Sequence, residues 1–207
     1  MSLKIDLHVH TCYSLDSSIT LKQVVSFAKK SGLDGVAITD HNTIKGALKL
    51  KTHGIIIIPG IEVSTSDGHL LGLGVTVPIP AKRGIEETIQ LIHDAGGIAV
   101  APHPTTFYKS PPSRKVSSYD AVEVMNASSV PFSILTHYSR RFAESLNLPQ
   151  TGGSDSHYAP EIGAAYTMVK SAVAVDEIVS AIKKGNVSPR GRGIPWKTRF
   201  ERILARF

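Results

Sequence analysis

Two histidines stand close together near the start of the chain, in the segment KIDLHVHTCYS. His8 and His10 end a run that is typical of a strand, and residues two positions apart on a strand project from the same face. Two imidazoles on one face can share a metal ion. Two neutral histidines hydrogen-bonded inside a core fit the same spacing, so this pair alone does not decide between the two.

The same arrangement recurs along the chain, where short apolar runs begin or end at a histidine or an acid. Six of the nine histidines lie beside predicted strand ends, whereas His53, His93 and His137 fall in predicted helices or at their ends. In α/β barrels the carboxyl ends of the strands converge on one mouth, which would gather residues that are distant in sequence. The residues beside these later strands are Asp40, His41, Glu62, His69, His103, Asp155 and His157.

Imidazole nitrogens and carboxylate oxygens without a thiolate suit Zn, Mn or Fe. A single zinc ion needs only about four ligands, so a larger set predicts two or three divalent ions. A carboxylate such as Glu62 could bridge two of them. Ions about 4 Å apart suit phosphoryl transfer, because they bind phosphate oxygens and lower the pKa of a water molecule. The candidate ligands are His8, His10, Asp16, His41, Glu62, His69, His103, Asp155 and His157.

The elements that would position these residues alternate between short apolar runs and amphipathic segments. This order is typical of an α/β protein with parallel strands, and about seven such units favour a closed or nearly closed barrel. Thr20 and Gln23 form a predicted capping box at the first helix. The predicted strands are 4–7, 34–39, 55–63, 69–75, 97–102, 120–125 and a short one ending near 153. The predicted helices are 20–32, 42–54, 84–97, 131–148 and 175–185, and 108–118 is predicted to be an exposed loop.

Length and composition favour one soluble domain. The chain has 207 residues and a single cysteine, Cys12, which excludes a disulfide within the chain. No apolar run is long enough to cross a bilayer, and the N-terminus lacks the pattern of a secretory signal. A cytoplasmic protein is therefore expected.

The net charge of +6 is concentrated at the C-terminus. Eight of the 23 Lys and Arg residues lie from Lys183 onward, opposed there only by Glu201, so the first 182 residues carry about −1. Residues 195–207 predict a basic amphipathic helix that docks on the domain formed by 1–194 or joins two copies in a homo-oligomer. Binding of nucleic acid, an anionic membrane surface or a protein partner is the alternative for this tail.

Several motifs, in this order, resemble the polymerase and histidinol phosphatase (PHP) superfamily over nearly the whole chain. They are DLHVHT, ITDHN, PGIEV, HLLGLG, APHP, GGSDSH and NVSPR. The resemblance implies an α/β fold, a distorted (β/α)7 TIM-like barrel. It also implies a metal cluster, usually trinuclear, at the mouth formed by the carboxyl ends of the strands.

The resemblance also implies how the ligands divide among three metal sites. The first would hold His8, His10, Glu62 and Asp155; the second Glu62, His69 and His103; the third Asp16, His41 and His157. Phosphatase members often carry His at the position of Asp16, so this chain is more similar there to the nucleotide phosphoesterase and polymerase-associated branches. Asp40 would support His41 or its loop, or cap the following helix, or do both.

Phosphate binding needs positive charge or backbone N–H groups. Arg140, Arg141 and Arg190 are the candidate substrate-binding cations, and a solvated helix face is the alternative for the first two. Asn126 ends a predicted strand at the same mouth and could contact substrate or a water molecule.

The function implied is a metal-dependent phosphoesterase that hydrolyses a phosphomonoester or nucleotide through a trinuclear centre and metal-activated water. Asp155 or His157 would assist proton transfer as the catalytic residues. Histidinol-phosphate hydrolysis uses the same metals and is an alternative. A non-catalytic scaffold or nucleic-acid-binding module that uses the basic tail is another, although a nearly complete ligand set disfavours it.

Overall fold

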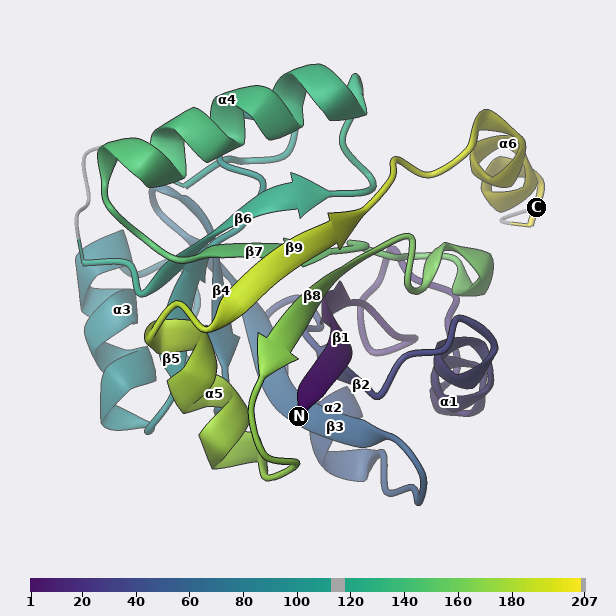
Figure 1. Ribbon diagram of the computed structural model, residues 1–207, viewed down its shortest axis with the longest axis horizontal. Coiled ribbons are helices and arrows are strands. Elements are labelled where there is room, and N and C mark those ends of the chain that lie inside the picture. Colours follow the sequence, from purple (N-terminus) through teal and green to yellow (C-terminus); the bar gives the residue numbers. More distant parts are fainter. Residues whose placement is uncertain (113–117, 206–207) are drawn as a thin grey trace.

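The computed structural model describes residues 1–112 and 118–205, and Figure 1 shows their arrangement. Part of the predicted loop 108–118 and the last two residues of the predicted tail helix lie outside the described residues. The strands are β1 (Ser2–Val9), β2 (Gly35–Ile38), β3 (Ile56–Thr65), β4 (Gly68–Leu73), β5 (Ile98–Ala101), β6 (Ala121–Asn126), β7 (Gln150–Gly153), β8 (Ala165–Lys170) and β9 (Val187–Gly191). The helices are α1 (Leu21–Lys30), α2 (Lys45–Lys49), α3 (Ile85–Asp94), α4 (Phe132–Ser145), the 3-10 helix η1 (Ala159–Glu161), α5 (Val175–Lys183) and α6 (Trp196–Leu204).

One mixed sheet runs through the described part of the chain, with nine strands in the order β7-β6-β5-β4-β3-β2-β1-β8-β9. The groups β1–β2–β3 and β5–β6–β7 are parallel, as predicted. The prediction of parallel strands is wrong for β4, which pairs antiparallel, and β8 and β9, which were not predicted as strands, also pair antiparallel. At β4 the reason is local, because only Ser66 and Asp67 separate it from β3, and such a short turn returns the chain antiparallel.

The sheet curls until its β7 edge lies beside β1 and β8, so the barrel is nearly closed. The backbone N–H of Asp155 donates to the carbonyl of His8 at 2.8 Å, and that of His10 donates to Ser156 at 3.1 Å. A side chain on Gly153 would place its Cβ only 2.5 Å from the Cβ of His8, so glycine permits this close approach. The fold is the predicted distorted TIM-like barrel.

Strands β8 and β9 were not among the predicted elements. The sequence of β9 includes Pro189, which has no N–H to donate to a neighbouring strand. Proline is tolerated in edge strands, and β9 is the last strand of the sheet. As an edge strand, β9 therefore tolerates a proline that a central strand would not.

The helices cover the outside of the sheet, and α6 stands apart near the C-terminus (Figure 1). The capping box of Thr20 and Gln23 is present at α1, and the predicted helix 84–97 buries its isoleucines as α3. The predicted helix 42–54 is wrong in extent, because only the five residues of α2 are helical. Asn42 instead has a φ of 56° and its N–H donates to the carbonyl of Glu62, which ties the chain to β3 before α2 begins.

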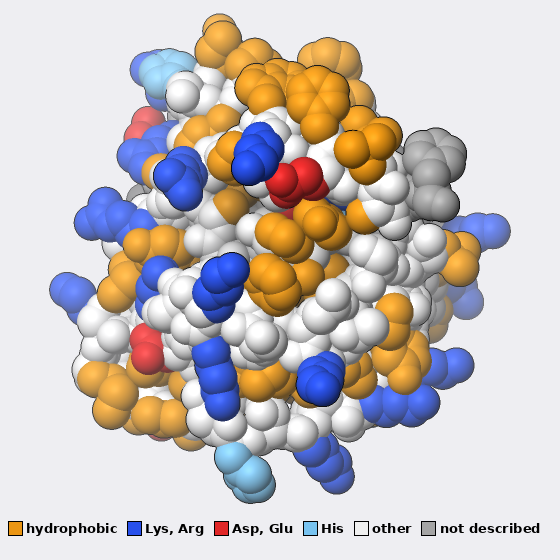
Figure 2. Space-filling model, turned by 90° about the vertical axis from the view of Figure 1, so that its right-hand side faces the viewer, with side chains coloured by type: hydrophobic (Ala, Val, Ile, Leu, Met, Phe, Trp, Pro, Cys, Tyr) orange, Lys and Arg blue, Asp and Glu red, His pale blue; other side chains and the backbone are white. Residues whose placement is uncertain are grey.

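The C-terminal helix α6 does not bury its apolar face as an amphipathic docking helix would. Trp196 and Phe200 are 66% and 63% exposed, while Arg199 and Arg202 turn toward the body. Figure 2, which looks onto the α6 side of the molecule, shows hydrophobic side chains gathered on the upper part of this face with Lys and Arg side chains around them. Across the described residues, none of the helices has the length and apolar character needed to cross a bilayer.

Candidate metal centre

The strand ends bring all nine predicted ligands to one mouth of the barrel. His8 lies within β1 and His10 just after it, Glu62 is on β3, His69 is on β4, and the others follow β1, β2, β5 and β7. A cleft of about 150 Å³ opens over them. Its lining residues are Asp16, His41, Glu62, His69, His103, Lys109, Asp155 and His157.

The deepest donor set surrounds a common point. Nε2 of His10 lies 3.1 Å from Nε2 of His8 and 3.2 Å from Oε2 of Glu62, and the same Glu62 oxygen lies 3.4 Å from His8 Nε2. Oδ1 of Asp155 lies 3.7 Å from His8 Nε2 and 3.5 Å from His10 Nε2. Ligand atoms held tetrahedrally about 2.1 Å from a zinc ion would be separated by about 3.4 Å. These four side chains therefore fit a divalent cation.

The second oxygen of Glu62 faces a different pair of histidines. Its Oε1 lies 3.0 Å from Nδ1 of His69 and 3.2 Å from Nε2 of His103. Glu62 is almost fully buried, so its carboxylate is fixed between the two sets. One carboxylate with an oxygen in each set has the geometry of a bridging ligand.

The third set lies at the more exposed side of the cleft. Oδ2 of Asp16 is 3.0 Å from Nε2 of His157 and 3.4 Å from Nε2 of His41. Nitrogens of His10, His41 and His157 also lie within 4.8 Å of one another. His41 Nδ1 is 3.2 Å from Oε2 of Glu62, so the third set adjoins the bridging carboxylate.

Two of these residues have backbone conformations that are uncommon outside glycine. The φ of His103 is 30° and that of Asp155 is 51°. Such angles cost free energy and persist where the surrounding contacts enforce them. Here the enforcing contacts include the N–H of His103 to Glu123 at 3.0 Å and the N–H of Asp155 to His8.

Asp40 supports the loop after β1. Its carboxylate accepts from the N–H of Thr11 at 2.6 Å, from the Thr11 hydroxyl at 2.7 Å and from the Ser14 hydroxyl at 2.9 Å. The Ser14 hydroxyl in turn lies 3.2 Å from Nδ1 of His10 and accepts the N–H of His41. Of the two predicted roles, Asp40 therefore has the supporting one, since α2 begins without a side-chain cap.

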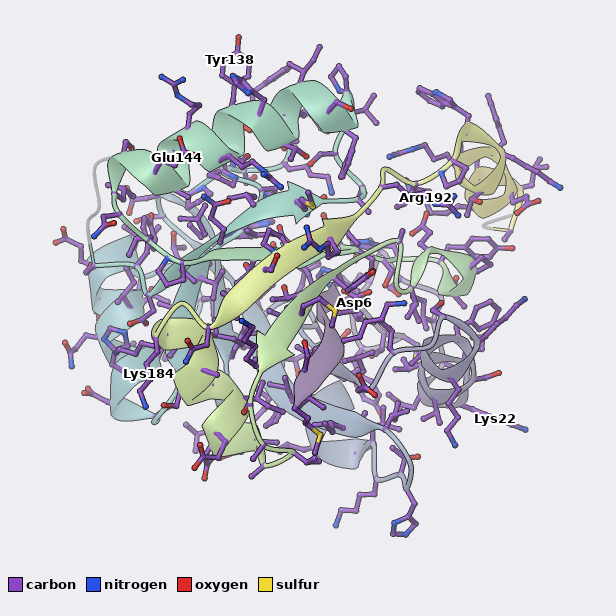
Figure 3. The ribbon with its side chains drawn as sticks, in the orientation of Figure 1. Asp6, Lys22, Tyr138, Glu144, Lys184 and Arg192 are labelled. Atoms are coloured by element: carbon purple, nitrogen blue, oxygen red, sulfur yellow. The ribbon has the colours of Figure 1, made fainter. Side chains whose placement is uncertain are left out.

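Glu123 and Asp6 are supporting acids that sequence reasoning missed. Glu123 lies 3.0 Å from Nδ1 of His8 and accepts from the Asn126 amide at 2.9 Å. Asp6 lies inside the barrel on β1 (Figure 3), where burial raises its pKa to about 6. It accepts backbone N–H groups of Ser154 and Gly163, which fixes the chain on either side of Asp155 and His157. Both acids lie inside strands, so the sequence gave no sign that they contact the proposed metal ligands or their loops.

The electrostatics of the cluster couple the acids to the imidazoles. Burial alone would raise the pKa of Glu62 and of Asp155, but neighbouring cationic groups, His8 foremost for Glu62 and Lys109 for Asp155, hold both pKa values well below their usual range. Burial alone would lower the pKa of His8, yet Glu123, Asp155 and Glu62 outweigh it and raise this pKa. The low pKa values of the two carboxylates reflect the positive charge around them, a role that a divalent cation would fill when bound.

Lys109 enters the cleft, although the sequence places it in a predicted exposed loop. Its side chain is 19% exposed, and its ammonium donates to the Ser128 hydroxyl at 3.1 Å and to the carboxylate of Asp155. Asn126 donates to the same carboxylate at 3.0 Å, while its contact with substrate or a water molecule stays a prediction. No spacing in the sequence distinguishes Lys109 from its neighbours.

The other predicted substrate contacts are not brought to the cleft. Arg140 and Arg141 lie on α4, whose buried positions are Leu135, Ser139 and Ala143, and Arg190 lies on the edge strand β9. None of the three arginines is among the described residues that line the cleft.

A family model and several known proteins match parts of the sequence. A family model described as PHP-associated matches residues 137–187. An uncharacterized protein of Methanocaldococcus jannaschii is 38% identical over 141 residues, which cover 60% of this chain and 82% of the relative. The phosphoribosyl 1,2-cyclic phosphate 1,2-diphosphodiesterase of Eggerthella lenta is 38% identical over 86 residues, which cover 37% of this chain and 32% of that enzyme.

The fold is also shared with solved structures. One of them, from Bacteroides vulgatus, is a two-domain protein containing a predicted PHP-like metal-dependent phosphoesterase. It superposes with a TM-score of 0.76 at 17% identity, over 99% of this chain and 70% of that chain. An identity this low shows the fold alone. The family model places this chain in the PHP superfamily, and the shared fold agrees with that membership.

Proposed function

We propose that this protein hydrolyses a phosphomonoester or nucleotide-type phosphoester with two or three divalent cations, Zn, Mn or Fe, held by the nine clustered ligands. The observation that carries the proposal is the carboxylate of Glu62, which turns one oxygen to His8 and His10 and the other to His69 and His103. Bound cations would polarise a water molecule and neutralise the phosphate oxygens.

The chain's own residues would bind and orient the ester. Lys109 lines the cleft and is not a proposed metal ligand. Its ammonium group is therefore suited to contact a phosphoryl oxygen. Asn126 donates to Asp155 and keeps that carboxylate aligned. Lys109 lines the cleft that a substrate would enter, whereas Asn126 is buried behind Asp155.

Of the two predicted catalytic residues, we assign proton transfer to His157, in a centre with two cations in which Nε2 of His157 is not bound to a third ion. The pKa of Asp155 is held well below its usual range, chiefly by Lys109 and His8 against the effect of burial, so its carboxylate does not carry a proton near neutral pH. His157 lies at the more exposed edge, with Nδ1 3.1 Å from the backbone oxygen of Asp155. That contact fixes the ring so that Nε2 faces the cleft beside Asp16.

The test is hydrolysis of p-nitrophenyl phosphate and of bis(p-nitrophenyl) phosphate by protein loaded with Zn, Mn or Fe. His41→Ala is expected to lower turnover by roughly 100-fold or more while the chain stays folded, because it removes a ligand of the third set. His137→Ala is the matched control, since His137 is an exposed histidine on α4. Absence of hydrolysis by the loaded protein, or equal activity of His41→Ala and His137→Ala, would contradict the proposal.

A further inference from the structure

A second and larger cleft adjoins the metal centre. Its volume is about 500 Å³, and it shares Asp16, Lys109 and His157 with the cleft over the proposed ligands. The two clefts are therefore neighbours, with these three side chains between them. The remaining lining residues are Tyr108, Ser128, Val130, Trp196, Arg199 and Arg202.

The far wall of this cleft is α6, which is fixed by its arginines. The guanidinium of Arg199 donates to the backbone oxygens of Ile194 at 3.0 Å, Ser128 at 3.1 Å and Ala127 at 3.1 Å. Arg202 pairs with Glu161 at 3.2 Å. Glu161 also accepts the N–H of His157 at 3.0 Å, so α6 is tied to the same loop that carries a proposed ligand. The wall therefore keeps its place relative to the metal centre.

The lining of this cleft combines flat aromatic surfaces with positive charge. Trp196 is 66% exposed, and its ring lies 5.7 Å from the guanidinium carbon of Arg199. Tyr108 is 49% exposed, and its hydroxyl donates to the backbone oxygen of Val130 at 2.9 Å. Exposed aromatic rings and guanidinium planes are the surfaces on which nucleobases stack. A small aliphatic leaving group would gain little from them.

We propose that this cleft binds the nucleoside part of a nucleotide ester, with the base stacked on Trp196 and the phosphate directed to Lys109 and the metal centre. The inference rests on the proposed function, because it places the scissile phosphate at the proposed ligands. Arg199 and Arg202 add positive charge along the path of an anionic substrate. The helix α6, rather than the barrel, would then determine which leaving group is accepted.

Trp196 is the only tryptophan of the chain, so its fluorescence reports directly on this cleft. The probe is the methylene phosphonate analogue of adenosine 5′-phosphate, which cannot be hydrolysed, added to the metal-loaded full chain and excited where adenine does not absorb. We expect saturable quenching by this analogue and none by the corresponding ribose phosphonate, which lacks the base. Absence of quenching, or equal quenching by both compounds, would overturn the inference.

Calorimetry with two variants provides a second readout. Trp196→Ala is expected to weaken binding of the adenosine phosphonate by roughly tenfold, because base–aromatic stacking is lost, and to leave binding of the ribose phosphonate unchanged. Phe200→Ala removes a similarly exposed aromatic ring of α6 that does not line the cleft, and is expected to change neither affinity by more than about twofold. Equal affinities of the two variants for the adenosine phosphonate would contradict the inference.

Failure of this inference and failure of the proposed function are distinguishable. Hydrolysis of p-nitrophenyl phosphate without quenching of Trp196 would overturn only the nucleoside cleft. Base-dependent quenching in a protein that hydrolyses no ester would support the nucleoside cleft and contradict hydrolysis.

Discussion

Glu123 holds several parts of the proposed metal centre without lining the cleft. Its carboxylate contacts Nδ1 of His8, the N–H of His103 and the amide of Asn126, all at about 3 Å. A carboxylate behind a ligating histidine fixes the ring and raises its basicity. The affinity for cations should therefore depend on Glu123 even though it offers no oxygen to the cleft.

Glu123→Gln is expected to lower the affinity for Zn or Mn by roughly 10- to 100-fold, because the ring of His8 loses a charged partner. The measurement is a competition titration between the protein and a chelator of known affinity. Glu144→Gln, at an exposed position on α4 (Figure 3), is the matched control and should bind metal as the unaltered chain does. Equal affinities of the two variants would contradict the supporting role.

For single residues, the sequence predicted the histidines and acids that recur beside apolar runs, and it missed residues outside that pattern. The nine proposed ligands were identified because histidines and acids follow apolar runs and match motifs of the PHP superfamily. Lys109 was missed because a lysine in a loop is ordinarily solvated, and only the folded chain brings it to Asp155. Arg140 and Arg141 were candidates because of their charge, with a solvated helix face as the alternative, and the face of α4 on which a residue lies decides whether it reaches the cleft.

At the scale of elements, α6 is attached to the barrel by hydrogen bonds and an ion pair rather than by apolar burial. Within the described residues of α6 no side chain is fully buried. Its periodicity correctly predicted a helix, and of the two docking modes expected for it, on the barrel or between two copies, the apolar stripe does not make the first. The carbonyls of Ala127 and Ser128 lie at the end of β6 and accept from Arg199, which turns the basic side inward.

Arg199→Ala is expected to release α6, because hydrogen bonds to three backbone carbonyls are lost at once. Chymotrypsin should then cleave at the aromatic residues of α6 several-fold faster, while the barrel itself remains resistant. Lys197→Ala is the control on the same helix, since the Lys197 side chain is 87% exposed. A cleavage rate for Arg199→Ala that matches this control would show that other contacts hold α6.

At the scale of the molecule, Asp120 connects elements at the end of the barrel away from the metal centre. Its carboxylate accepts the N–H of Ala99 at 2.8 Å and lies 2.7 Å from Nε2 of His93 on α3 and 2.9 Å from the ammonium of Lys183 on α5. Burial alone would raise the pKa of Asp120, but these contacts outweigh it and lower the pKa from 3.8.

Because the folded pKa of Asp120 is lowered, its contribution is complete above the unfolded pKa of about 4 and is lost as the pH falls through the folded value. Asp120→Asn is therefore expected to lower the free energy of unfolding by about 1 kcal/mol near neutral pH, a modest value because Lys183 is partly solvated. The difference from the unaltered chain should disappear in acid. Denaturant unfolding of both proteins, free of metal and at several pH values, measures this difference in the free energy of unfolding. A difference that does not change with pH would contradict the role given to the Asp120 carboxylate.

The overall architecture was predictable where local signals and topology agree. Alternating strands and helices, together with the motifs, predicted the barrel and the mouth at which the ligands meet. The antiparallel strands β8 and β9 were not predicted, because β8 pairs with the first strand from near the other end of the chain and β9 contains a proline. Closure at Gly153 likewise depends on a long-range contact with His8.

The most direct test of the account is an anomalous difference map from crystals of the metal-loaded protein. We predict one peak among His8, His10, Glu62 and Asp155, and a second beside the other oxygen of Glu62 with His69 and His103. A third peak would lie with Asp16, His41 and His157. A map in which the loaded protein has no peak among these side chains, or has its peaks elsewhere on the molecule, would contradict the metal centre.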